Sequence, residues 1–121
     1  MGKRSSPAVE PTHIQSVKKG TTSSHTAQMV NGRTRLKGVI VCCTNNLANP
    51  NTKVTLYNGI ADTDPVALEL EFSVYAIYGG TQLIPIPGNG ILCDNGIYLS
   101  KEYSAGGIFS VAILFQGGKA D

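Results

Sequence analysis

The segment Leu83–Leu99 constrains the fold most strongly, because it alternates short apolar runs with turn signals. It contains two prolines, Pro85 and Pro87, followed by two Asn-Gly pairs. Proline has no amide donor and does not fit a regularly paired central strand. Asn-Gly tolerates the positive φ that tight hairpin turns require. The segment therefore predicts a sheet edge or a crossing between sheets, followed by a strand through 97–99.

The rest of the chain beyond residue 32 alternates short strand patterns with turns. The clearest pattern is Val66–Tyr75, in which apolar and polar residues alternate. One side carries Leu68, Leu70, Phe72 and Val74, and the other carries Glu69, Glu71 and Ser73. Further strands are expected over 35–43, 52–57 and 107–116, with loops over 44–51 and 100–107. No segment has a strong helical period, so we predict an all-β fold, a compact antiparallel β-sandwich of jelly-roll-like form.

The first 29 residues differ from the rest because they have no hydrophobic period. They are rich in serine and threonine and contain both histidines, His13 and His25. Such a segment cannot bury enough apolar surface to offset its ordering entropy. We therefore expect residues 1–29 to be extended, with few contacts to their own body. The predicted domains are an extended basic N-terminal arm over residues 1–32 and a sandwich domain over 33–121.

Charge is distributed unevenly along the chain. Residues 1–37 contain seven lysines and arginines against Glu10 alone, which gives +6, whereas residues 38–121 contain three lysines against seven acids, which gives −4. A basic arm on an acidic body is a charge pattern suited to docking. The candidate partner-binding residues are Lys3, Arg4, Lys18, Lys19, Arg33 and Arg35.

The chemistry of an active site is missing from the pattern. Both histidines fall in the arm, where a positioned general base is not expected. Glu69 and Glu71 fit a solvated strand face, and a Thr-Asp-Pro turn explains Asp62 and Asp64 without a calcium ion. We therefore expect no enzyme activity, no cofactor and no metal site.

The cysteines and the remaining composition bound the partners further. Cys42 and Cys43 are adjacent, so a disulfide between them would be strained, and we expect three reduced thiols that act as small core residues. No apolar run approaches the length of a membrane span or a signal peptide. The basic residues are thinly spread and lack interleaved aromatics, which makes a nucleic-acid partner unlikely.

The sandwich resembles small structural proteins of tailed bacteriophages, of the head-decoration or cement kind. The resemblance spans roughly residues 33–117 and rests on turns and alternation in the fold. Its residues are Arg35–Val41, Val54–Gly59, Leu68–Leu70, Ile84–Ile91, Asn95–Leu99 and the closing strand Val111–Phe115. The basic N-terminal segment is not part of this pattern, and the family has no active-site residues to carry over.

The resemblance implies a virion structural protein that is made in the host bacterial cytoplasm and sits on the capsid surface. Its expected partners are the major capsid protein and copies of itself, as a homo-trimer or another symmetric oligomer. The alternative is a protein of the tail or fibre whose tyrosines contact a host glycan. The five tyrosines are Tyr57, Tyr75, Tyr78, Tyr98 and Tyr103.

Overall fold

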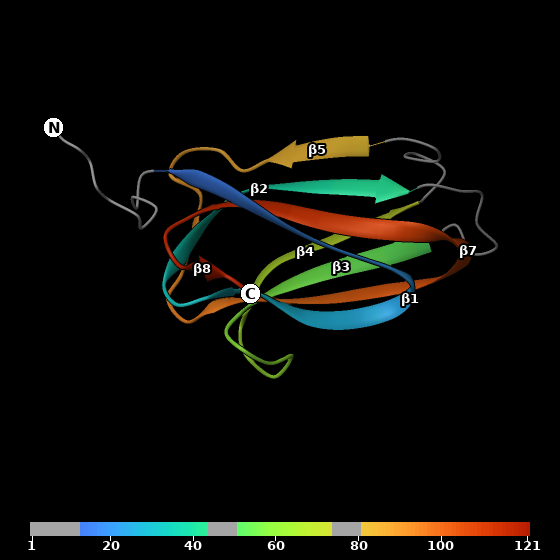
Figure 1. Cartoon of the computed structure of the whole chain (residues 1–121), viewed down its shortest axis with the longest axis horizontal. Helices are drawn as coiled ribbons and strands as arrows, with labels where there is room; N and C mark the ends of the chain where they lie inside the picture. Colours follow the sequence, from blue (N-terminus) through green and yellow to red (C-terminus); the bar gives the residue numbers. More distant parts are fainter. Residues whose placement is uncertain (1–12, 44–50, 74–80) are drawn as a thin grey trace, which may run out of the picture.

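The computed structural model describes residues 13–43, 51–73 and 81–121, and its regular structure there consists of β-strands alone. The predicted all-β sandwich is therefore confirmed (Figure 1). The strands are β1 (Ile14–Asn31), β2 (Thr34–Cys43), β3 (Asn51–Asn58), β4 (Val66–Ser73), β5 (Thr81–Pro85), β6 (Ile91–Cys93), β7 (Gly96–Gln116) and β8 (Lys119–Ala120).

Two long strands, β1 and β7, take part in both layers of the sandwich. The first half of β7 pairs with β3, from Ile97 opposite Asn58 to Glu102 opposite Lys53. Its second half pairs with β2, from Phe109 opposite Cys43 onward. The first layer therefore runs β4–β3–β7–β1–β8, and in the second layer β2 lies between β7 and the short strands β5 and β6. All of these pairings are antiparallel.

The ribbon formed by β1 and β7 passes from one layer to the other. Its register is irregular between Thr21 and Ser23 and again between Ser23 and His25. Irregular register of this kind bends a strand pair and increases its local twist. Figure 1 shows the ribbon turning at the side of the molecule marked β7. The bend places the two halves of each strand in different layers.

The expectation that residues 1–29 make few contacts with their own body is wrong for β1. Ile14–Asn31 pairs with β7 along nearly its whole length, and the expected boundary at residue 32 falls in the turn between two strands of one sandwich. The composition argument weighed only apolar burial. Backbone hydrogen bonds to β7 and a few inward residues, including Val17, Met29 and Val30, hold the strand in place. Residues 1–12 lie outside the described residues.

The loop expected over residues 100–107 is also absent, because β7 continues without a break from Gly96 to Gln116. The small residues of this stretch suggested a loop. Pairing with β1 carries the strand through it, and Ser104 lies opposite Ser23. The other loop expected, over 44–51, falls mostly outside the described residues.

The core lies between the layers and is formed by alternate residues of the long strands. Phe109, Val111, Ile113 and Phe115 of the predicted strand over 107–116 face inward, and each is fully buried. The other buried apolar residues are Met29, Val30, Leu36, Val39, Val41, Val54, Leu56, Cys93, Ile97 and Leu99. Leu68 and Leu70 of β4 pack against this cluster as expected. The side chains of Phe72 and Val74 lie outside the part of the chain that the structure describes.

The proline-containing segment forms a sheet edge, as predicted. β5 ends at Pro85 and pairs on one side with β2, and β6 pairs with the start of the same strand. The turn between them is fixed to β2, because the Ile86 amide donates to the Lys37 carbonyl oxygen at 3.1 Å. Gly90 has a φ of 80°, and a Cβ at this position would collide with the Leu36 carbonyl oxygen. Glycine is therefore required here.

Candidate interaction surfaces

The outer side of the first layer carries a polar face. Because Val54, Leu56 and Leu99 point into the core, their neighbours along β3 and β7 point outward. The polar face consists of Lys53, Thr55, Tyr57, Glu69, Glu71, Tyr98, Ser100 and Glu102. Register places these residues in cross-strand rows, in which each group has a direct neighbour on the next strand.

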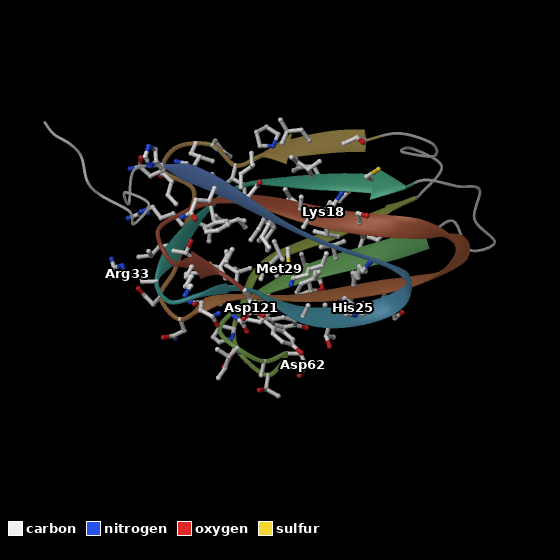
Figure 2. All side chains as sticks on the ribbon, in the orientation of Figure 1. Lys18, His25, Met29, Arg33, Asp62 and Asp121 are labelled. Carbon is white, nitrogen blue, oxygen red and sulfur yellow. The ribbon has the colours of Figure 1, made fainter. Side chains whose placement is uncertain are left out.

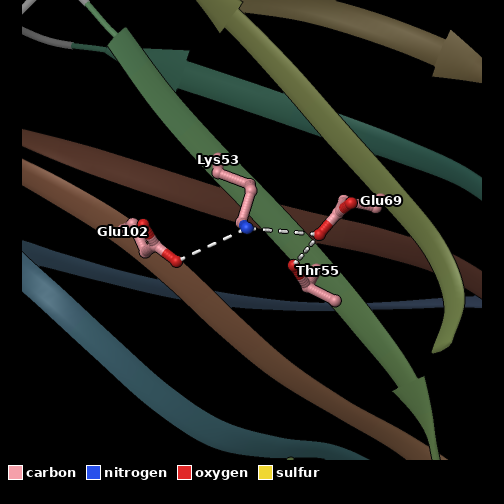
Figure 3. Close-up of polar contacts among 4 residues, drawn as sticks. All are labelled: Lys53, Thr55, Glu69 and Glu102. Carbon is pink, nitrogen blue, oxygen red and sulfur yellow. Dashed lines mark hydrogen bonds and ion pairs between the residues drawn. The ribbon is translucent and has the colours of Figure 1, made fainter. Parts of the chain in front are cut away.

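Lys53 lies between two carboxylates at the centre of this face (Figure 3). Its Nζ is 3.4 Å from Glu69 Oε2 and 3.7 Å from Glu102 Oε2. The neighbouring charges, Glu69 first and Glu102 second, raise the pKa of Lys53. Thr55 Oγ1 donates to the same Glu69 oxygen at 3.2 Å, and Thr55 is only 3% exposed. Lys53, Glu69 and Glu102 are therefore paired within the chain.

Two tyrosines occupy the end of the polar face next to the β3–β4 connection. The rings of Tyr57 and Tyr98 are tilted by 53°, with centroids 6.4 Å apart. Gln28 lies opposite Tyr98 on β1, and its amide nitrogen is within donor distance of three carbonyl oxygens. These belong to Val30 (2.7 Å), Gly59 (3.1 Å) and Ile97 (3.2 Å). Gln28 thus joins β1, β7 and the loop that follows β3.

The outer side of the second layer has a different character, and we call it the apolar face. It consists of Ile14, Lys18, Arg35, Ile40, Leu83, Leu92, Ala112 and Leu114, with smaller residues between them. Ile14 is 57% exposed and Leu83 is 54% exposed. Lys18 and Arg35 are its charged residues, and no described residue of this face carries a carboxylate.

Gly38 forms the floor of the apolar face. A Cβ at this position would lie 3.3 Å from Leu114 Cδ1 and 3.7 Å from Leu83 Cδ1. The two leucine side chains therefore converge over the strand from both neighbouring strands, β7 and β5. The result is a continuous apolar surface across three strands, with its large side chains on the outside of the molecule.

The basic residues predicted from sequence do not form one site. Lys18 lies on the apolar face opposite Ala112, whereas Lys19 points to the other side of β1 and donates to the Asp121 carbonyl oxygen at 3.4 Å. Arg33 lies in the turn between β1 and β2, 3.8 Å from Asp94 Oδ1. Arg35 is the second residue of β2. Figure 2 shows Lys18 and Arg33 at separate places on the molecule. Lys3 and Arg4 lie outside the described residues.

The connection between β3 and β4 forms a second exposed feature, which we call the β3–β4 loop, residues 59–65. Asp64 Oδ2 accepts hydrogen bonds from the amides of Ile60 (2.8 Å) and Ala61 (3.2 Å). The Asn58 amide donates to the Pro65 carbonyl oxygen at 2.8 Å. The sequence predicted a turn at Asp62 and Asp64. It did not predict that Ile60 would be 69% exposed on a loop held by hydrogen bonds within the chain.

Lys101 is a buried cation that the sequence reading missed. Its Nζ donates to the Phe109 carbonyl oxygen and lies 5.4 Å from the centroid of the Phe109 ring. Burial lowers the pKa of Lys101 to about 8. His25 lies opposite it on β1. Lys101 faces inward because it continues the alternation of the buried residues Ile97 and Leu99 along β7. The sequence analysis did not apply this alternation beyond residue 99, because it expected a loop there.

The cysteines only partly follow their expected role. Cys93 is buried in the core, and burial raises the pKa of its thiol to about 11. Cys42 lies on the outer side of β2 and is partly exposed, so its expected core position is wrong. The Cys43 side chain is outside the description. In the described part of the chain, histidine, cysteine and carboxylate side chains form no cluster that could hold a metal ion. No helix among the described residues could span a membrane.

No family model matches the chain, and no curated protein matches its sequence. A solved structure described as "nora virus structure" contains a chain that is 8% identical, with a TM-score of 0.39. The match covers 98% of this chain and 66% of the Nora virus chain.

Proposed function

We propose that this protein is a virion structural protein of the head-decoration kind, which binds the major capsid protein and bridges its subunits on the capsid surface. The observation that carries the proposal is that two of the predicted basic residues, Arg33 and Arg35, lie at the end of the sandwich where β1 begins. Ile14 and Arg35 lie on either side of Gln116, so the N-terminal segment joins β1 beside the start of β2. Arg33 lies at this same end, and Lys3 and Arg4 belong to the segment that leads into it.

A protein of this kind acts by binding rather than by catalysis. Contacts that exist only in the assembled capsid add free energy to the assembled state and to no other. A basic segment and a folded body that touch neighbouring subunits would reinforce each other through their linkage. The proposal needs no cofactor, metal, membrane or nucleic acid. It places synthesis in the bacterial host cytoplasm and the mature protein on the virion, and the sequence resemblance to head-decoration proteins supports it.

The test uses particles of the encoding virus prepared with and without this protein. Decorated particles should release their genome at a higher temperature than undecorated ones. Arg33→Glu should weaken binding to undecorated particles at low salt and less so at high salt, because exposed charge pairs are screened. Gln82→Glu, at an exposed position opposite Val41 near the other end of β2, is the control. Equal heat resistance with and without the protein would exclude the bridging role.

The tyrosine pair favours a second candidate, a tail- or fibre-associated protein that binds a host glycan. Tyr57 and Tyr98 offer aromatic surface beside the hydroxyl of Ser100 and the charged groups of the polar face. Under this alternative, Tyr98→Ala would reduce attachment of the virus to its host and leave the heat resistance of the particle unchanged. Under the bridging proposal the same variant would leave attachment unchanged.

A further inference from the structure

The four large apolar side chains that are exposed in the described structure divide into two pairs. Ile14 and Leu83 belong to the apolar face, whereas Ile60 and Val66 lie on and beside the β3–β4 loop. Figure 1 shows β5 at the top of the molecule and the β3–β4 loop at the bottom, so the two pairs lie on opposite sides. Exposed apolar clusters of this kind commonly mark contact surfaces.

The charges near the two pairs are opposite in sign. Lys18 and Arg35 are the charged residues of the apolar face, and no described carboxylate lies among them. The β3–β4 loop carries Asp62 and Asp64 and no basic residue. Asp62 is exposed, and Figure 2 places it at the far side of the molecule from Lys18. Each surface therefore offers apolar contact together with a charge that the other lacks.

From this complementarity we infer that the apolar face binds the β3–β4 loop of a second copy of the chain, in a head-to-tail contact. Two apolar faces placed against each other would bring four cations together without a described carboxylate between them, which disfavours a symmetric face-to-face dimer. A head-to-tail contact repeats from copy to copy, and it forms a ring when the rotation closes and a filament when it does not.

The loop is suited to this contact because its shape is fixed before binding. Asp64 holds the amides of Ile60 and Ala61, and the Gly59 amide donates to the Gly96 carbonyl oxygen at 3.0 Å. Gln28 adds a hydrogen bond to the Gly59 carbonyl oxygen. A Cβ at Gly59 would collide with the Asp64 carboxylate, so the loop packs closely around that side chain. Little conformational entropy is then lost when Ile60 meets a partner.

The inference is independent of the virion role and can be tested on the purified chain. Sedimentation velocity over a concentration series should show assembly of the 12.7 kDa protomer, and high salt should weaken it. Leu83→Glu damages the apolar face, and Ile60→Lys damages the loop. Each should raise the concentration needed for assembly by about tenfold or more, as expected for a central apolar contact. Gln82→Glu adds the same charge on the next residue of β5, which points away from the apolar face, and should have little effect.

Mixing the two variants gives the decisive result. The Leu83→Glu protein retains an intact loop, and the Ile60→Lys protein retains an intact apolar face. At a concentration at which the wild type assembles and neither variant does so alone, the mixture should form heterodimers through the intact face of one variant and the intact loop of the other. Circular dichroism melting of each variant would confirm that both remain folded. A wild-type protein that stays monomeric, an Ile60→Lys variant that assembles normally, or a mixture that stays monomeric would each overturn the inference.

Discussion

The polar face and the apolar face share one strand, β7, yet their charged residues are arranged in opposite ways. On the polar face, Lys53 lies between two carboxylates, and a buried threonine hydroxyl donates to one of them. On the apolar face, Lys18 and Arg35 flank leucine and isoleucine side chains, and the described residues there supply no carboxylate. The comparison shows that the lysine of the polar face is paired within the chain, whereas the two cations of the apolar face have no described carboxylate beside them on that face.

This difference arises from how each strand alternates on either side of the bend. In the first half of β7, the outward residues are Tyr98, Ser100 and Glu102, and in the second half they include Ala112 and Leu114. Among the inward residues of β7 whose side chains the structure describes, all but Lys101 are apolar. Core formation alone therefore accounts for half of the strand pattern. Packing of the core does not explain why the outward residues of the second half of β7, Ala112 and Leu114, are apolar.

The largest expected change in stability comes from comparing a core residue with a residue of the apolar face. Ile113 and Leu114 are neighbours on β7, and the first is fully buried while the second is partly exposed. Ile113→Ala should lower the free energy of unfolding by about 2–5 kcal/mol, because it leaves a cavity in the core. Leu114→Ala should lower the free energy of unfolding of the monomer by much less. Chemical denaturation at low protein concentration measures both.

Repeating the denaturation of both variants at several protein concentrations would separate the roles of Ile113 and Leu114 further. Leu114 should become more important as protein concentration rises, because assembly covers the apolar face and couples to folding. Ile113→Ala should show the same loss at every concentration. If Leu114→Ala costs as much as Ile113→Ala in dilute solution, then the apolar face is covered by the chain itself, and its contrast with the polar face disappears.

The sequence predicted the layered β-fold and most of the inward residues, because alternation and Asn-Gly turns are local signals. It misassigned β1, whose stability depends on pairing with β7, a strand distant in sequence. The sequence analysis also placed a loop over residues 100–107, because this stretch is rich in small residues, and it therefore did not assign Lys101 to a strand. The apolar face follows only from register, since Leu83, Ile40 and Ala112 become neighbours across three strands. No local pattern in the sequence reports that arrangement.

The second prediction compares two lysines on opposite sides of the first layer. Lys53 lies outside beside carboxylates, whereas Lys101 lies inside, where burial lowers its pKa from 10.5 to about 8. Between these values the unfolded chain binds more protons at this site than the folded chain. Stability should therefore rise with pH across the window, by about 1–3 kcal/mol at most, and the contribution should be lost below pH 8.

The matched variant is Lys101→Met, which removes the titrating group and keeps an unbranched side chain in the core. Urea denaturation from pH 7 to pH 10.5 should show a smaller rise in stability for this variant than for the wild type. Other groups also titrate in this range, so the difference between the two curves is the measurement. Parallel curves would mean that Lys101 reaches water in the folded state, contrary to its burial.

The smallest effect concerns the buried hydroxyl of the polar face. Thr55→Val keeps the shape of the side chain and removes the hydrogen bond from Oγ1 to Glu69 Oε2. Lys53 still neutralises Glu69, and the partly exposed carboxylate can recruit water, so the loss in free energy of unfolding should be about 0.5–1.5 kcal/mol. Thr55→Ser, which keeps the hydroxyl, should recover part of it. Because this hydrogen bond lies within one chain, the loss measured by urea denaturation should not change with protein concentration. A loss that grew with concentration would show that the polar face, too, takes part in assembly.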